Sequence, residues 1–297
     1  MNRKPFIFLF LFLLIPAKPY AQENRLENVD LALIAQVNQG NSYITFPFEI
    51  GNMEPLIFEA NLIPDFILRE SKSSRLIGVI TPQIIIRMYN EYSYPVRTPS
   101  YIPQLTTYYQ IGNKKMDELL TVYGRLGHHS NGQDDPLILE DGSINHKSGD
   151  FATNFIETGL IVTSFNRKTN AVRFFKAGFE YHPENSVHRE LKGIYSRHRL
   201  NFSFAAFKLP PEEKHQKEKA RFSLDIKTNF LLGYMGGEND FFHDRLQTRI
   251  TFSYYPSFLQ EIGFFVEFYH GKDYYNVYYD ITRNFLRFGL MTNKLRF

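Results

Sequence analysis

Apolar and polar residues alternate along most of this 297-residue chain. In the stretch RFSLDIKTNF, residues 221–230, the apolar side chains have even numbers and five polar side chains have odd numbers: Arg221, Ser223, Asp225, Lys227 and Asn229. Successive side chains of a β-strand point to opposite faces, so this segment would have one oily face and one charged face. The alternation therefore predicts amphipathic strands.

The same alternation recurs in segments of about ten residues, the length of a tilted strand that crosses a membrane. Nearly every segment repeats the alternation, and the polar faces taken together carry charges of both signs, which suits the polar lumen of a barrel closed by hydrogen bonds. The pattern favours an all-β fold, a transmembrane antiparallel β-barrel of about 12 strands; a soluble sandwich or ligand-binding barrel is the alternative. The predicted strands lie near residues 42–50, 56–68, 75–90, 101–112, 117–130, 150–164, 170–182, 194–207, 220–232, 245–255, 261–270 and 284–297.

The predicted connections between these strands differ in length. Turns 113–116 and 166–169 are short, whereas the connection 131–149 is long. Outer-membrane barrels have short periplasmic turns and longer extracellular loops, and an even strand number returns the chain to its starting side. We therefore expect the short turns in the periplasm and 131–149 outside the cell. The charged connector 209–220 would be a periplasmic turn of unusual length.

The first 21 residues have a basic start and an apolar run, which is typical of a secretory signal peptide. We expect a signal peptide at 1–21, one barrel domain at 22–297, and export to the outer membrane. Removing Arg3, Lys4 and Lys18 would leave 31 basic residues against the 31 acidic ones, so nothing in the charge favours a nucleic-acid partner.

Three composition features bear on the membrane prediction. The chain has no cysteine, so a disulfide framework and thiolate metal sites are excluded. After the leader no run of 18 apolar residues occurs, which excludes a helical membrane protein. The 29 Phe and 19 Tyr residues suit the aromatic girdles of a membrane barrel.

Three polar residues are predicted on the lipid-facing side of the barrel. His128 and Ser130 have even residue numbers, like the apolar side chains on one face of the fifth predicted strand. Asn154 has the same relation, which we call parity, to the apolar side chains of the sixth. A serine nucleophile needs a base to take its proton, and the base needs a partner that holds its ring in one tautomer. An amide can serve as that partner without placing a carboxylate at a lipid boundary. The alternative interpretation is ordinary polar residues at a barrel rim, where strands emerge into lipid headgroups.

The stretch HHSNGQDDP, followed by an asparagine at the start of the next strand, resembles the outer-membrane phospholipase A family, whose signature is His-x-Ser-Asn-Gly, an acidic loop and then Asn. The stretches SYPVRTPSYIPQL and YHGKDYYNVYYDITRNFLRFGL are also similar to segments of that family. The resemblance implies that His128 is the general base, Ser130 the nucleophile and Asn154 the orienting residue. The amide of Gly132 would contribute to the oxyanion hole.

The resemblance also implies a Ca²⁺ cofactor and a homodimer. Ser93 falls where the family supplies a calcium-binding hydroxyl from the partner subunit, and Gln133 where it supplies a backbone carbonyl; Asp135 and Asp150 are further oxygen candidates, or simply part of a solvated acidic loop. The loop between His128 and Asn154 is longer than expected of the family, because it contains the insertion LILEDGSINHKSG, residues 137–149.

The predicted function is that of a calcium-dependent serine hydrolase that cleaves acyl esters of phospholipids in the outer leaflet of the outer membrane. Its partners would be phospholipid substrate and outer-membrane lipid. The main alternative is a non-enzymatic outer-membrane barrel, either a small pore or an inactive phospholipase-like protein. A soluble lipid-binding β-protein is a third possibility.

Overall fold

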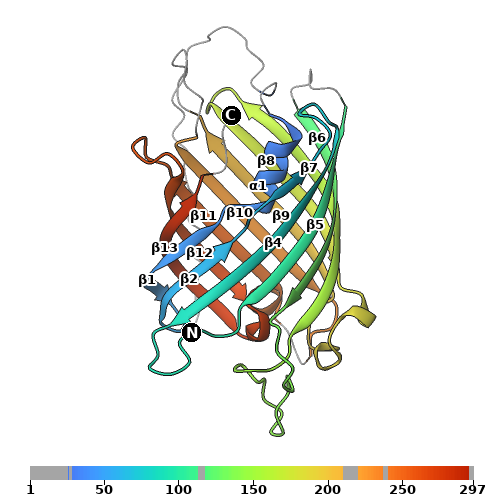
Figure 1. Cartoon of the computed structure of the whole chain (residues 1–297), viewed down its shortest axis with the longest axis vertical. Coiled ribbons are helices and arrows are strands. Elements are labelled where there is room, and N and C mark those ends of the chain that lie inside the picture. Colours follow the sequence, from blue (N-terminus) through green and yellow to red (C-terminus); the bar gives the residue numbers. More distant parts are fainter. Residues whose placement is uncertain (1–25, 27–28, 113–117, 210–219, 237–239, 294–297) are drawn as a thin grey trace, which may run out of the picture.

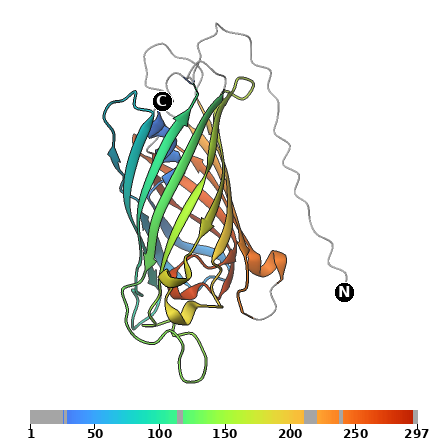
Figure 2. The same cartoon turned by 90° about the vertical axis from the view of Figure 1, so that its right-hand side faces the viewer.

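The computed structural model describes residues 26, 29–112, 118–209, 220–236 and 240–293. Their strands form one antiparallel sheet that closes on itself, because β1 pairs with β13 and β2 pairs with β4 (Figures 1 and 2). Both β2 and the short β3 pair with β4, at different points along it, so together they fill one place in the barrel wall. The thirteen strands therefore occupy twelve positions. The strands are β1 Tyr43–Gly51, β2 Leu56–Leu62, β3 Phe66–Leu68, β4 Leu76–Tyr89, β5 Ser100–Ile111, β6 Glu118–Ser130, β7 Ala152–Asn166, β8 Ala171–Tyr181, β9 His198–Lys208, β10 Phe222–Leu232, β11 Leu246–Tyr254, β12 Ile262–Lys272 and β13 Thr282–Thr292.

The barrel confirms the fold predicted from the alternation. The predicted strand at 56–68 is interrupted between β2 and β3, where Pro64 stands. Proline has no backbone N–H to give to a neighbouring strand, so it interrupts the ladder. The last strand begins at Thr282 rather than 284, and the end of its predicted range, 294–297, lies outside the described residues, as does the predicted leader at 1–21.

The two faces of the strands differ as the alternation predicts. On β12, Phe264 and Phe268 are exposed on the outer face, whereas Glu267 is buried inside the barrel. On β10, Phe222 is exposed and Ser223 is buried. The outer wall is therefore apolar and suited to hydrocarbon, as in membrane barrels.

The two ends of the barrel carry different connections. At the end that we call the turn end lie the connection 167–170 and the end of β13; at the opposite loop end lie the connections 131–151, 182–197 and 273–281 (Figure 2). Among the described residues the loop end also carries four short 3-10 or π-helical segments: η2 Glu184–Ser186, η3 Arg189–Leu191, η4 Phe241–Arg245 and η5 Asn276–Tyr278.

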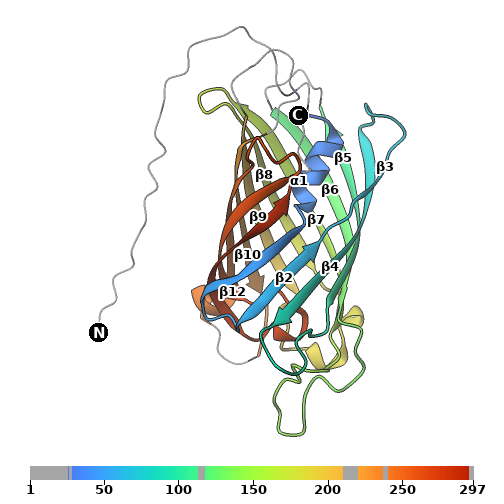
Figure 3. The same cartoon turned by 60° about the vertical axis from the view of Figure 1, so that its left-hand side comes forward.

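Helix α1, Leu31–Gln39, lies inside the barrel towards the turn end (Figure 3). Asp30 caps it by accepting a hydrogen bond from the amide of Leu33 at 2.8 Å, and Gly40 ends it with φ 84°. Its apolar side chains, among them Leu33 and Ile34, belong to a buried cluster with inward residues of β4 to β9. No element is predicted from the sequence for residues 22–41, so the helix is a finding of the structure. None of the helices in the described ranges could cross a membrane.

A network of buried charges lies in the lumen. Glu59 of β2 accepts hydrogen bonds from Arg87 of β4 at 2.7 Å and from Arg287 of β13 at 2.8 Å. Arg87 also donates two bonds to Asp273, at 2.7 and 2.8 Å, and Arg287 pairs with Glu267 at 2.7 Å. These side chains come from β2 and β4 on one side of the β1–β13 pairing, and from β12, β13 and the connection after β12 on the other. The network therefore joins the two ends of the sheet where the barrel closes.

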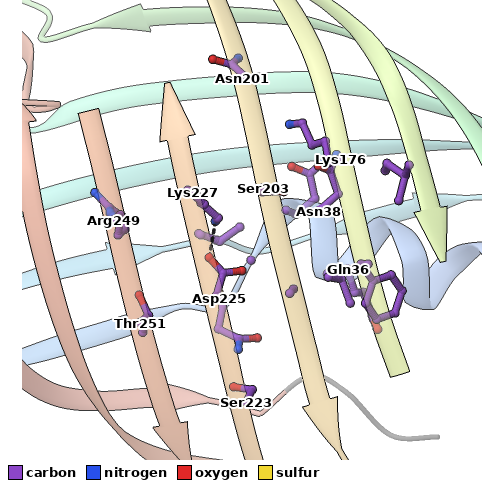
Figure 4. Close-up of a pocket in the computed structure, with 18 of the residues that line it drawn as sticks. Gln36, Asn38, Lys176, Asn201, Ser203, Ser223, Asp225, Lys227, Arg249 and Thr251 are labelled. Atoms are coloured by element: carbon purple, nitrogen blue, oxygen red, sulfur yellow. Dashed lines mark ion pairs between the residues drawn. The ribbon is translucent and has the colours of Figure 1, made fainter. Parts of the chain in front are cut away.

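Beside α1 the lumen contains a polar cavity of about 310 Å³ (Figure 4). Side chains of α1 and of β8 to β11 line it, and Asp225 and Lys227 form an ion pair of 3.9 Å within it. Hydrophilic residues thus line this part of the barrel interior, and α1 and the charge network lie within the same lumen.

This filled lumen leads to the first prediction. We expect the refolded protein to produce no porin-sized conductance in planar bilayers, because α1 and the buried arginine network obstruct the lumen. A general-diffusion porin in the same bilayers is the control. Sustained conductance steps of porin size would show that the lumen is open and would support the pore alternative.

Candidate active site

His128 and Asn154 lie directly opposite each other on β6 and β7. Their side chains are joined by a hydrogen bond of 2.8 Å between Nδ1 of the histidine and Oδ1 of the asparagine. Leu126 and Ile156, on the same face of the two strands, are 56% and 48% exposed. The pair therefore lies on the outer surface of the barrel, among side chains that would contact lipid.

Ser130 is the last residue of β6 and has the same parity as His128. Cβ atoms of residues i and i+2 on one strand face are about 7 Å apart, so rotation of both side chains can bring a hydroxyl towards a ring nitrogen. Within the described residues the two side chains are not hydrogen-bonded to each other. Because Asn154 contacts Nδ1, the nitrogen left for the serine hydroxyl is Nε2.

A loop that is distant in the sequence holds the side-chain amide of Asn154. Nδ2 of Asn154 donates to the backbone carbonyl oxygen of Ser186 at 3.4 Å. In the same loop, the backbone N–H of His188 donates to the carbonyl of Ala152 at 2.9 Å. Connection 182–197 thereby lies against the first residues of β7. An amide that donates from Nδ2 to this carbonyl presents Oδ1 to His128. Sequence reasoning missed Ser186, since a backbone carbonyl on another loop has no residue-type signal.

Asn131 follows Ser130 and is buried. Its Nδ2 donates to the carbonyl of Gly149 at 2.8 Å, and its Oδ1 accepts from the amide of Phe151 at 3.0 Å. The side chain thus joins the beginning of the long connection to its end. The signature motif contains this asparagine, but its role as a loop anchor emerges only from the structure.

Gly132 has a φ of 68°, in the left-handed region that side-chain-bearing residues rarely adopt. The chain therefore turns sharply two residues after Ser130. A glycine at this position fits a turn that passes close to the candidate nucleophile.

The long connection folds over the loop end of the barrel. Leu137, in the insertion, is completely buried, and its amide donates to the carboxylate of Glu190 at 2.7 Å. His146 stacks on Tyr278 with ring centroids 4.9 Å apart and approaches Asp280 at 3.1 Å. His129 points inward, as its parity predicts, and packs edge-on against Phe151.

The candidate calcium ligands are only partly brought together. The amide of Asp150 donates to the carbonyl of Asp135 at 2.8 Å, so these two acidic residues are neighbours. The carboxylate of Asp150 also lies 3.5 Å from His188, and Gln133 is two residues before Asp135. Ser93 is exposed on the separate connection between β4 and β5.

These residues fit Ca²⁺ in donor chemistry, because all would offer oxygen. Within the described residues no three histidine, cysteine or carboxylate side chains lie together as a group that could hold a metal ion.

The architecture is that of an outer-membrane β-barrel with its candidate site on the outer wall. Three solved structures have the same fold as this chain: outer membrane phospholipase A from Escherichia coli, with a TM-score of 0.57; an active-site mutant of that protein, with 0.56; and the Salmonella typhi outer membrane phospholipase dimer with bound calcium, with 0.56. Each alignment has 14% identity and covers 85% of this chain and 90% of the other. No family model and no curated protein matches the sequence. The resemblance to outer-membrane phospholipase A is thus confirmed for the fold.

Proposed function

We propose that this chain is a phospholipase A of the outer membrane, a serine hydrolase that cleaves acyl esters of phospholipids in the outer leaflet. The observation that carries the proposal is the hydrogen bond between His128 and Asn154 on the outer wall. His128 lies two residues before Ser130 on the same strand. Placing a polar pair on a lipid-facing surface costs free energy, so such a pair usually marks a functional site. Lipid esters are the substrates that such a site meets.

In the proposed reaction His128 accepts the proton of the Ser130 hydroxyl at Nε2, while Asn154 holds the proton on Nδ1. The serine oxygen attacks the ester carbonyl and forms a tetrahedral intermediate, towards which the amide of Gly132 donates. The C–O bond to the lysophospholipid breaks, and the leaving oxygen takes the proton from His128. Water then attacks the acyl-serine with His128 again as base, which releases the fatty acid and restores Ser130.

Calcium would be held by Gln133, Asp135 and Asp150 of one chain together with Ser93 of the partner subunit. When bound, it would supply positive charge beside the ester oxygen. This part of the proposal includes a calcium-dependent homodimer, because the hydroxyl of Ser93 would come from the partner subunit. Export by a leader at 1–21 and insertion of 22–297 as one domain are likewise proposed.

The direct test is hydrolysis of a phospholipid by the refolded protein in detergent. We expect release of free fatty acid and lysophospholipid at a rate well above that of heat-denatured protein. If a correctly folded barrel with calcium releases neither product, the chain is an inactive phospholipase-like barrel and the proposal is wrong.

The metal requirement can be tested separately. We expect excess EDTA to abolish hydrolysis, and added Ca²⁺ to restore it better than Mg²⁺, because Ca²⁺ accepts the irregular geometry of loop oxygens. The variants Asp135→Asn and Asp150→Asn should raise the Ca²⁺ concentration for half-maximal activity several-fold. Glu140→Gln, in the same connection and exposed, is the matched control. Full activity in excess chelator would refute the calcium assignment and leave the serine mechanism in place.

A further inference from the structure

A second cavity lies inside the barrel at the loop end and is distinct from the outward-facing pair of His128 and Asn154. It has a volume of about 460 Å³, within the range of sites for small molecules. Inward side chains of β6 and of β9 to β12 line it, together with residues of the loop-end connections. We call it the loop-end cavity.

Aromatic rings form one wall of the loop-end cavity. Phe151, Tyr195 and Tyr279 contact one another, with ring centroids 5.7 Å apart for Phe151 and Tyr195, 6.0 Å for Phe151 and Tyr279, and 5.5 Å for Tyr195 and Tyr279. His129 packs against Phe151 at 4.8 Å. Aromatic rings provide large and rigid apolar surface, and tyrosine adds a hydroxyl at its edge.

The charged groups on the cavity wall are paired within the protein. Lys272 lies 3.0 Å from Asp244, and Arg199 lies 3.3 Å from Glu180. Asp273 is held by Arg87. A charged ligand would have to compete with these pairs, so the cavity favours a neutral one.

Three buried polar atoms of residues on the cavity wall have no hydrogen-bond partner among the described residues: Nε2 of His129, Nε of Arg199 and the hydroxyl of Tyr279. Buried polar atoms are nearly always paired, so unpaired ones in a cavity indicate bonding capacity for a guest. Burial raises the pKa of the Tyr279 hydroxyl, which therefore stays neutral and able to donate. The amides of Asn229 and Gln247 also line the wall; Nδ2 of Asn229 donates to Oε1 of Gln247 at 3.4 Å, which leaves Oδ1 of Asn229 for a guest.

We propose that the loop-end cavity binds a neutral sugar of one or two rings. A pyranose has an apolar C–H face that packs against aromatic rings, and hydroxyl groups around its edge that exchange hydrogen bonds with amides, imidazole and phenol. The aromatic wall, the unpaired polar atoms and the internally paired charges match that chemistry together. The sugar could be free in solution or the saccharide part of a glycolipid.

The test is calorimetric titration of the refolded full chain, in a zwitterionic detergent without a sugar headgroup. The probes are glucose, galactose, N-acetylglucosamine, maltose and lactose, with detergent-solubilised lipopolysaccharide as a second arm. We expect saturable binding of at least one free sugar, which supports a soluble source, or of lipopolysaccharide alone, which supports a glycolipid source. Absence of saturable binding to every probe would overturn the proposal.

Two variants place the binding in the cavity. Tyr279→Phe removes only the unpaired hydroxyl and should weaken binding about three- to tenfold, the effect of one lost hydrogen bond. Met235→Trp adds bulk to the lining and should abolish binding. Tyr234→Phe is the matched control, because Tyr234 is exposed and does not line the cavity.

All three variants are first checked for a folded barrel by heat-modifiable migration in gels. Wild-type affinity in a folded Met235→Trp protein would put the sugar elsewhere and overturn the assignment. Because binding is measured without ester hydrolysis, this result is independent of whether the chain is a phospholipase.

Discussion

Replacing Ser130 with alanine is expected to lower phospholipid hydrolysis by at least about 1,000-fold, because no other group would attack the ester carbonyl. The barrel should remain folded, since the Ser130 side chain makes no hydrogen bond within the described residues and is only half-buried. The measurement is the rate of fatty-acid release from phospholipid in mixed micelles, with saturating Ca²⁺.

The control for this variant is Ser164→Ala. Ser164 lies on the outer face of β7, near the turn end and far from His128 along the strand pair. The Ser164→Ala protein should retain wild-type activity and should show the same heat-modifiable migration as the Ser130→Ala protein. Activity close to that of the wild type in the Ser130→Ala protein would exclude Ser130 as the nucleophile.

Replacing Glu59 with glutamine is expected to destabilise the barrel by about 3 kcal/mol or more, because it removes one charge from a buried, paired network. The carboxylate is fully buried and accepts hydrogen bonds from Arg87 and Arg287, as well as from Tyr43 at 2.6 Å. Without its charge each guanidinium group keeps only its other carboxylate partner, Asp273 for Arg87 and Glu267 for Arg287. The measurement is reversible unfolding in urea in the presence of lipid vesicles.

Glu184→Gln is the matched control for the Glu59 variant. Glu184 pairs with Arg197 at 2.9 Å, but its side chain is 58% exposed, and water screens such pairs. We expect its unfolding midpoint to stay at the wild-type value. Equal midpoints for the Glu59 and Glu184 variants would show that the luminal network does not stabilise the closure.

The strands and their faces could be predicted from the sequence, because period-two alternation depends only on which side chains lipid and lumen accept. Helix α1 could not be predicted this way. It has fewer than ten residues, and its apolar side chains are buried by the inner wall of β4 to β9, which is built from distant parts of the chain. The interruption at Pro64 does have a signal in the sequence, because proline lacks the N–H that a strand ladder needs. The alternation of apolar and polar residues does not show it.

The candidate site was predictable to a similar degree. Parity and strand order put His128, Ser130 and Asn154 on one outer surface, but parity is equally satisfied by several registers two residues apart. Only the pairing of β6 with β7 places Asn154 directly opposite His128. Likewise, the contacts of Asn131 with Gly149 and of Asn154 with Ser186 depend on how two long connections fold over the loop end.

The sequence by itself determined that this chain forms an amphipathic barrel and that a histidine, a serine and an asparagine have the lipid-facing parity, since side-chain direction along a strand is a local property. The tertiary structure alone decided the register between the strands, the helix and charge network in the lumen, and the loop-end cavity. Each of these depends on contacts between residues far apart in the chain, whose free energies arise only after the barrel has closed.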